Sequence, residues 1–422
     1  MASPVEELTG PAAIDPGVED VFANAARNRQ NPPAQDQTMV INMGPQHPST
    51  HGVLRLVVEI DGETVVSLAP DIGYLHTGIE KTCEAKFYQQ VVPLTDRIDY
   101  LCPMTNNLTY CLAVEKLLGL EIPERAQYLR VLLNELTRIQ SHLVWLGTHA
   151  MDIGALTIFL YCWREREDIM RIYENVSGQR MMTSYFRVGG LALEPPLDFY
   201  KQVQDFLNIM PDRITQYENL LTGNPIWMNR LKGVGYLSAA DAIALGVTGP
   251  PLRASGVDWD LRRDMPYSGY EKFQFAVPVS NVGDVWARYV VRIQEMRESL
   301  KICQQALDGM PQGRIVADAP KIILPDREKM KTEMESLIHH FKIVTEGFGV
   351  PAGEVYQAVE SPRGEMGYYV VSDGTAKPYR VHMRNPSYAT LQSLETMCKG
   401  RLLADVVAVI GSIDIVLGEI DR

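Results

Sequence analysis

Residues 53–68 contain two β-rich runs, Val53-Leu-Arg-Leu-Val-Val-Glu-Ile60 and Glu63-Thr-Val-Val-Ser-Leu68, which are joined by Asp61-Gly62. An Asp-Gly dipeptide between such runs is a strong hairpin signal, because it readily adopts the positive φ angles of a tight turn. The stretch therefore predicts a β-hairpin, preceded by a short extended run that begins at Met39.

From about residue 78 the apolar spacing becomes helical. One amphipathic helix is expected to end near Gly119, with its apolar face formed by Leu108, Cys111, Leu112, Leu117 and Leu118. Pro123 opens a second helix, with an apolar face formed by Leu129, Leu132, Leu133, Leu136 and Ile139. Further helices are predicted over 157–177, 198–222, 284–309 and 326–346, and the run from Val285 to Met310 is expected to be the longest.

The C-terminal part returns to short strands, at residues 367–372 and 379–383. A central helical bundle flanked by small antiparallel sheets from both ends is an α+β architecture. The expected organisation is a mobile acidic, Pro- and Ala-rich arm over 1–37, a hairpin region over 38–78, a helical bundle core over 79–346 and a β-rich segment over 347–422.

The composition limits the possible partners. The 422 residues are 46% hydrophobic and 22% charged, and 52 acidic against 40 basic residues give a net charge of −12. A nucleic-acid binder needs a basic face, so this balance argues against that function. The most apolar stretch, residues 154–163, is about half the length of a membrane span. We therefore expect a chain that does not cross a membrane.

The N-terminus lacks the basic start and apolar core of a signal peptide. Six cysteines are widely spaced without a CxxC pair, which favours reduced thiols in a cytoplasmic compartment and argues against a four-cysteine cluster.

His47 and His51 are four residues apart, a spacing that two metal ligands use on a helix. Pro45 and Pro48 forbid a regular helix here, and no third ligand is nearby. The alternatives are a loop whose histidines bond to backbone groups and a binding loop held rigid by prolines.

Three other polar features need partners. Asp96-Arg-Ile-Asp-Tyr100, taken alone, favours a helix cap with a surface salt bridge. Glu135, Arg138 and His142 share one helix face, which is either solvent-facing or a buried network. Asp152 lies in an apolar setting, where a carboxylate is costly without a His or Arg partner.

Several long motifs resemble the 49-kDa quinone-reductase subunit family of respiratory complex I, also called the D subunit. They cover the chain from about residue 39 to its end and include Gly44-Pro-Gln-His-Pro-Ser-Thr-His-Gly-Val-Leu-Arg55, Gly73-Tyr-Leu-His-Thr-Gly-Ile-Glu-Lys81, Arg97-Ile-Asp-Tyr100, Asn134-Glu-Leu-Thr-Arg-Ile-Gln-Ser-His142, Leu252-Arg-Ala-Ser-Gly256, Pro266-Tyr-Ser-Gly-Tyr270, Glu360-Ser-Pro-Arg-Gly-Glu365, Ser412-Ile-Asp414 and Asp421-Arg422.

This family is related to the large subunit of nickel–iron hydrogenases, and the resemblance implies that fold. Those enzymes hold their metal with two CxxC pairs. Here Asp99 stands in place of the first cysteine, Cys102 remains, and Asp414-Ile-Val-Leu-Gly-Glu419 contains none. One thiolate cannot hold a metal that needs four, so no metal ligands are expected.

The resemblance implies that the vacated cavity binds a quinone headgroup, ubiquinone or menaquinone. By resemblance, His51 and Tyr100 are the headgroup ligands, and Asp152 is the carboxylate partner of that histidine. A neutral tyrosine donates across the physiological pH range, whereas a histidine can change charge there.

The resemblance also implies that electrons arrive from a [4Fe–4S] cluster in the adjacent B subunit, near Arg97. Met182 stands where many relatives have a histidine, so the cluster potential is expected to depend less on pH. Ile415 replaces a usual proline and is expected to loosen the C-terminal turn slightly.

The implied partners are the B, C and I subunits of complex I and the H and A subunits of its membrane arm, on the cytoplasmic side of the bacterial inner membrane. The sequence leaves two alternative functions. The first is a hydrogenase, or a related enzyme that receives its electrons from ferredoxin or formate. The second is a non-catalytic scaffold whose site has lost its function. The missing cysteines argue against the hydrogenase. His51, Tyr100 and Asp152 are all present, which argues against the scaffold.

Overall fold

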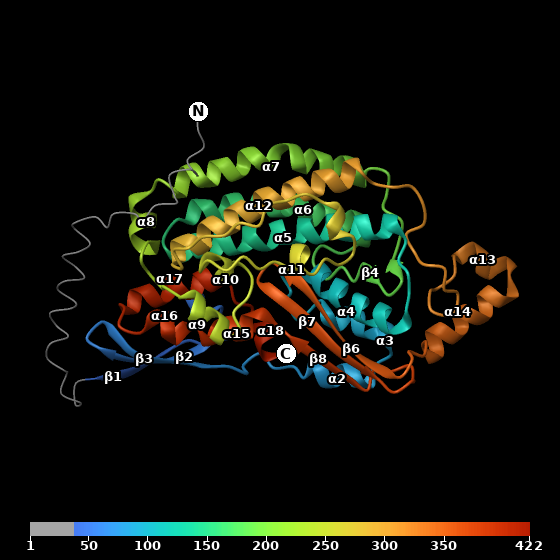
Figure 1. Cartoon of the computed structure of the whole chain (residues 1–422), viewed down its shortest axis with the longest axis horizontal. Coiled ribbons are helices and arrows are strands. Elements are labelled where there is room, and N and C mark those ends of the chain that lie inside the picture. The colour runs from blue at the N-terminus through green and yellow to red at the C-terminus, as the bar shows by residue number, and fades with distance from the viewer. Residues whose placement is uncertain (1–37) are drawn as a thin grey trace.

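A computed structural model describes residues 38–422 as a mixture of helices and three small antiparallel sheets (Figure 1). The predicted α+β class is therefore confirmed. The arm predicted over residues 1–37 lies outside the described residues.

The predicted hairpin is confirmed as β2 (Arg55–Asp61) and β3 (Thr64–Asp71), and β1 (Met39–Met43) pairs antiparallel with β2. Gly62 adopts a φ of +61° in the turn, as the Asp-Gly dipeptide predicts. Alternate residues of β2 are buried, which gives this sheet one face toward the core.

Four long helices form the bundle (Figure 1): α5 (Glu124–Asp152), α6 (Leu156–Ser177), α7 (Phe199–Leu221) and α12 (Val285–Asp308). Helix α5 packs against α6 and α12, and α7 packs against both α6 and α12. The longest helix is α5, with 29 residues, so the prediction that 285–310 would be the longest was wrong. Shorter elements surround this bundle: η2 (Pro48–Thr50), α2 (Ile79–Ala85), α3 (Tyr88–Thr95), α4 (Pro103–Leu118), β4 (Phe186–Arg187), β5 (Gly190–Leu191), α8 (Pro225–Leu231), α9 (Ala239–Ala244), α10 (Pro250–Ala254), α11 (Leu261–Asp264) and η3 (Tyr270–Lys272).

The C-terminal segment combines strands and helices. Strands β6 (Gly353–Ser361), β7 (Gly364–Ser372) and β8 (Arg380–Arg384) form an antiparallel sheet against α4. After Arg384 the chain forms four helices: α15 (Pro386–Gln392), α16 (Leu394–Cys398), α17 (Leu403–Ile413) and α18 (Leu417–Asp421). The β-rich character expected for 347–422 is thus limited to its first half.

The helix predicted over 326–346 is two helices, α13 (Arg327–Thr332) and α14 (Met334–Glu346), because Glu333 between them has an extended backbone. Within residues 38–422, no helix is long and apolar enough to cross a membrane.

The polar stripe on α5 belongs to a buried ionic network. Glu135 pairs with Arg262 at 3.1 Å, and His142 contacts Glu295 at 2.9 Å. Arg253 bridges Glu295 and Glu360, both at 2.7 Å. These side chains are at most 1% exposed, which decides the open question in favour of a buried network.

This network predicts a large loss of stability when its central cation is removed. Arg253→Met leaves Glu295 and Glu360 without their main cation, and such a break typically costs about 3–5 kcal/mol. The matched control Arg263→Met removes an exposed pair with Asp258, worth under about 1 kcal/mol. Urea unfolding of the full-length chain should show a lower midpoint for Arg253→Met alone; equal midpoints would contradict this role.

Candidate functional site

The loop that carries His51 is fixed by its own hydrogen bonds. The Nδ1 atom of His47 accepts a bond from the amide of Ser49 at 3.2 Å, and the Thr50 hydroxyl donates to the carbonyl of His47 at 3.0 Å. His51 follows η2 with a φ of +56°, a left-handed conformation that is uncommon for residues other than glycine. Such a strained residue is held in place by its surroundings, and it is often functional.

His51 is accessible to solvent and is nevertheless strongly affected by the surrounding protein. Desolvation, aided by the positive charge of Arg363, lowers the pKa of His51 from 6.5 to about 4. The imidazole is therefore neutral near pH 7, unless a bound group raises its pKa.

Tyr100 lies between α3 and α4 and is half-buried. Burial raises the pKa of Tyr100, the charges of Asp99 and Glu419 add to this rise, and Arg363 opposes it. Helix α18 approaches closely: a Cβ atom on Gly418 would lie 2.6 Å from the carbonyl of Ile98 and 3.2 Å from the Tyr100 ring. Glycine at this position therefore allows the C-terminal helix to pack directly against the tyrosine.

Arg363 lies at the centre of the site, with its side chain 1% exposed. It pairs with Asp99 at 2.5 Å and with Asp414 at 3.2 Å, and its Nε donates to the Asp414 carbonyl at 2.8 Å. These bonds join the loop before α4, the β6–β7 turn and the segment before α18. The hypothesis of a helix cap with a surface salt bridge at residues 96–100 was wrong, because α4 begins after Cys102 without a side-chain cap bond and the ion pair of Asp99 is fully buried.

Two further groups complete this centre. The Cys102 thiol donates to Asp99 at 2.6 Å, and burial raises its pKa well above 9.0. Glu419 accepts a bond from the amide of Ser387 at 2.9 Å, while its Oε2 has no hydrogen-bond partner among residues 38–422. Burial and the nearby Asp99 raise the pKa of Glu419 to about 8, against the opposing charge of Arg363.

Asp152, at the C-terminal end of α5, is half-buried. Desolvation raises its pKa to about 6, and the charge of His47 opposes this rise. Within the described chain its carboxylate makes no hydrogen bond or ion pair. The histidine that influences Asp152 is thus His47, and the predicted bond to His51 is not formed in the chain by itself.

Arg97 is exposed, and its guanidinium donates to the carbonyl of Pro93. The adjacent Asp96 accepts bonds from the amide and hydroxyl of Ser184, at 3.1 and 2.6 Å. This contact places the loop that contains Met182 beside the Arg97 segment.

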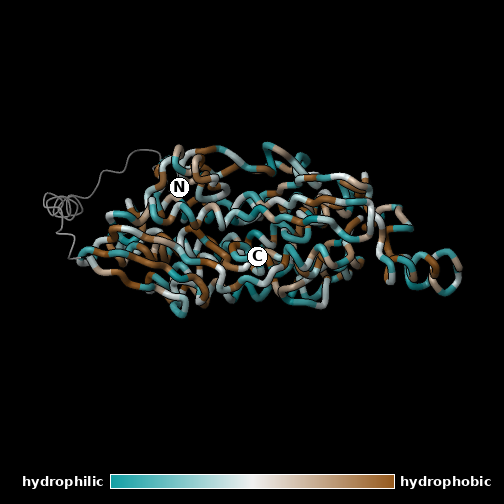
Figure 2. Tube along the Cα trace, turned by 90° about the horizontal axis from the view of Figure 1, so that it is seen from below, coloured by the Kyte–Doolittle hydropathy of each residue, from teal (hydrophilic) through white to brown (hydrophobic). Residues whose placement is uncertain are grey.

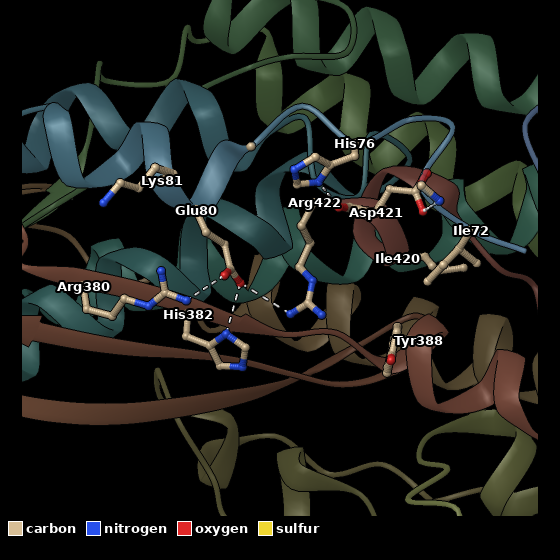
Figure 3. Close-up of a pocket in the computed structure, with 12 residues that line it drawn as sticks. Ile72, His76, Glu80, Lys81, Arg380, His382, Tyr388, Ile420, Asp421 and Arg422 are labelled. Atoms are coloured by element: carbon tan, nitrogen blue, oxygen red, sulfur yellow. Dashed lines mark hydrogen bonds and ion pairs between the residues drawn. The ribbon is translucent and has the colours of Figure 1, made fainter.

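A separate pocket of about 470 Å³ lies between α2, β8 and the C-terminal residues (Figure 3). Glu80 there meets Arg380, His382 and Arg422, at 3.2–3.4 Å. Asp421 accepts bonds from the amides of Gly73 and Leu75, at 2.8 and 2.6 Å. The pocket therefore contains the contacts that fasten the Gly73–Lys81 motif to the C-terminal residues, and it contains none of the predicted site residues.

The positive charge of Arg363 acts on both His51 and Tyr100, whereas Arg97 lies on the surface. Across residues 38–422, no group of three or more His, Cys, Asp or Glu side chains is arranged to hold a metal ion. Neither Arg363 nor Glu419 was predicted as a site residue, although Arg363 lies in the Glu360–Glu365 motif and Glu419 ends the Asp414–Glu419 segment. The signal in the sequence was that acids, Asp99 and Asp414, stand in the two segments where the related hydrogenases have cysteines, because buried acids need a cation.

Comparisons with known proteins agree with the motifs. Residues 152–422 match the family model described as respiratory-chain NADH dehydrogenase, 49 Kd subunit. The chain is 74% identical to the NADH-quinone oxidoreductase D subunit 2 of Koribacter versatilis (strain Ellin345), over 92% of this chain and 97% of that protein. It is 66% identical to the D subunit 1 of Solibacter usitatus (strain Ellin6076), over 91% and 94%. It is 59% identical to the D subunit of Trichlorobacter lovleyi (strain ATCC BAA-1151 / DSM 17278 / SZ), over 92% and 100%.

The raised pKa of Glu419 predicts a pH-dependent stability. In the unfolded chain this carboxyl ionises near 4.5, whereas in the folded chain it holds its proton to about pH 8. The folded state then binds more protons, so raising the pH from 6 to 8 costs the folded state on the order of 2 kcal/mol. Glu419→Gln cannot ionise, so its stability lacks this loss between pH 6 and pH 8.

The thermal midpoints of Glu419→Gln and wild type are measured from pH 6 to 9. The midpoint of Glu419→Gln should rise relative to that of wild type as the pH increases. The exposed control Glu346→Gln should show a constant difference. A constant difference for Glu419→Gln would mean that this carboxyl is already ionised at pH 6.

Proposed function

The chain belongs to the family of the 49 kDa subunit of respiratory-chain NADH dehydrogenase, also named the D subunit of NADH-quinone oxidoreductase, and on this premise we propose that it binds and helps to reduce the quinone. In this proposal the headgroup binds to His51 and Tyr100. The observation that carries the proposal is that one buried cation, Arg363, acts on both of these side chains.

The chemistry of the two side chains suits a quinone headgroup. Reduction to the quinol adds two electrons and two protons, and negative charge develops on both carbonyl oxygens. The Tyr100 hydroxyl, kept protonated by its raised pKa, donates to one oxygen. His51 contacts the other oxygen, where developing negative charge favours protonation of its neutral ring. The positive charge of Arg363 acts on the same two side chains.

Two carboxyl groups are suited to supply protons. Asp152 has a pKa of about 6 and Glu419 a pKa of about 8, so both exchange protons near neutral pH. Asp152 lies beside the loop of His51, since the charge of His47 acts on it. A rotation that brings Asp152 to His51 when quinone binds would form the predicted pair.

The relation to hydrogenases is part of this proposal. The two segments expected to replace the metal-binding cysteines, residues 97–102 and 414–419, meet around Arg363. The guanidinium and its acids occupy the position between them. This supports a former metal cavity that now serves as the charged floor of a quinone site.

The electrons come from a neighbouring subunit in this proposal, since a [4Fe–4S] cluster there supplies one-electron transfer. The exposed Arg97 and the adjacent Met182 loop form the face turned toward it. The B, C, I, H and A subunits as partners, and the cytoplasmic side of the membrane as location, belong to the same proposal. The effects of Met182 and Ile415 remain predictions.

Tyr100→Phe keeps the aromatic ring and removes the donated bond. A donor to developing charge is worth roughly 1.5–3 kcal/mol, so inhibitor-sensitive NADH:quinone reduction in membranes should fall about 10-fold or more. NADH oxidation by an artificial acceptor, and the content of assembled complex, should stay normal. Tyr379→Phe, at an exposed tyrosine, is the matched control. Wild-type quinone reduction in Tyr100→Phe would place the headgroup elsewhere.

His51→Ala should raise the KM for a short-chain quinone and lower turnover, since the second oxygen loses its partner. The control His382→Ala changes a half-exposed histidine that is not part of the proposed site. Unchanged KM and turnover in His51→Ala would exclude this histidine as a headgroup ligand.

A further inference from the structure

The end of helix α17 is held by side chains from two other helices. The C-terminus of the chain lies near the middle of the long axis in both views (Figures 1 and 2). The last carbonyls of a helix have no partner inside the helix. Here the indole of Trp145, on α5, donates to the carbonyl of Gly411 at 2.8 Å, and Arg292, on α12, donates to the carbonyl of Ser412 at 2.7 Å. Arg288, one turn earlier on α12, donates to the Ser412 hydroxyl at 3.0 Å.

This helix end carries Asp414, the partner of Arg363. Asp414 directly follows α17 and has a φ of +52°, a left-handed conformation that is uncommon for residues other than glycine. Such a conformation persists only where the surrounding structure holds it. The two α12 arginines hold Ser412, two residues earlier, and Arg363 donates to the Asp414 carbonyl at 2.8 Å. Together these bonds fix the position of Asp414.

The two α12 arginines are costly to bury. Arg288 and Arg292 are both 0% exposed, and their hydrogen bonds go to carbonyl and hydroxyl oxygens. The Nε and Nη2 atoms of Arg292 have no hydrogen-bond partner among residues 38–422. Apolar side chains of similar volume often stabilise an interior more than buried charges do. The filling of space therefore does not explain two arginines at these positions.

Arg292 also acts on Asp414 through its charge. Burial raises the pKa of the Asp414 carboxyl, the charges of Arg363 and Arg292 oppose this rise, and Asp99 adds to it. Burial lowers the pKa of Arg292 to about 10, so its guanidinium stays charged near neutral pH. Arg292 therefore favours the ionised form of the acid that pairs with Arg363.

We propose that Arg292 is a positioning residue of the quinone site. With Arg288, it holds the end of α17 so that an ionised Asp414 stays paired with Arg363. The guanidinium of Arg363 then keeps its place and its counter-charge while it acts on the two headgroup ligands. Glu295, three residues after Arg292, belongs to the buried ionic network, so α12 joins that network to the site. This inference rests on the proposed function, and neither α12 arginine touches the headgroup in it.

Neutral and charged substitutions of Arg292 separate this role from a merely structural one. In Arg292→Met the Asp414 carboxyl loses an opposing charge, so it should hold its proton to a higher pH than in wild type. Arg363 then lacks an ionised partner at low pH. Relative to wild type, kcat/KM for a short-chain quinone in membranes should fall at least about 5-fold more at pH 6 than at pH 8.5. Arg292→Lys keeps a positive charge at pH 6, so its ratio to wild type should be the same at both pH values.

The matched control is Arg297→Met, which removes a part-exposed pair with Glu218 on the same helix and should match wild type at both pH values. The content of assembled complex is measured for every variant. A merely structural role would lower activity equally at the two pH values. Such an equal loss in Arg292→Met, or the same pH-dependent loss in Arg292→Lys, would overturn the proposal.

Thermal unfolding of the full-length chain tests the link to Asp414 without quinone. A carboxyl whose pKa is raised in the folded state makes the protein less stable as the pH rises toward that pKa. From pH 5 to 7 the midpoint of Arg292→Met should therefore fall by about 2 °C or more relative to that of Arg292→Lys. Adding Asp414→Asn to both variants should abolish this trend.

The absence of this trend, or its persistence in the Asp414→Asn background, would overturn the proposal. Tyr100→Phe decides the proposed function separately. A loss of quinone reduction in Tyr100→Phe, together with no trend in the unfolding midpoints, would overturn the role of Arg292 alone.

Discussion

The ion pairs of Arg363 are the constraint on which the site depends. Their carboxylates come from Asp99, near the start of the bundle, and Asp414, close to the C-terminus, and the arginine itself lies in the turn between β6 and β7. Three segments distant in sequence therefore have to meet at one guanidinium, because a buried charge without partners costs several kcal/mol. The same meeting brings α18 against Tyr100 and places a cation near His51. The bonds that hold these three segments together therefore also set the electrostatic surroundings of His51 and Tyr100.

The bundle around this centre is unusual in its charged interior. Arg253, Arg262, Glu135 and Glu295 are all fully buried, and each meets an opposite charge. Hydrophobic side chains fill space with little preference for one neighbour, whereas a buried ion pair tolerates only its partner. We infer that this network fixes how α5 and α12 face each other, and that this rigidity helps to hold the segments joined by Arg363 in register.

The sequence predicted the parts whose signals are local. The hairpin at residues 53–68 and helices α4, α5, α6, α7 and α12 follow from periodicity and from Asp-Gly, Pro and Gly residues. The stripe on α5 did not reveal its burial, because His142 meets Glu295 from 153 positions away. The break at Glu333 has no Gly or Pro to signal it. Helix α17 was missed because Val406, Val409 and Ile410 are β-branched, and tertiary packing outweighs that preference. His51 and Tyr100 came from the family resemblance, and the link between them through Arg363 required the fold.

The most direct test of the account is a structure of the intact complex with a quinone-headgroup inhibitor bound. The account predicts that one polar atom of the headgroup lies within hydrogen-bond distance of the Tyr100 hydroxyl, that another faces His51, and that Arg363 keeps both of its carboxylates. A headgroup bound out of reach of both Tyr100 and His51 would contradict it.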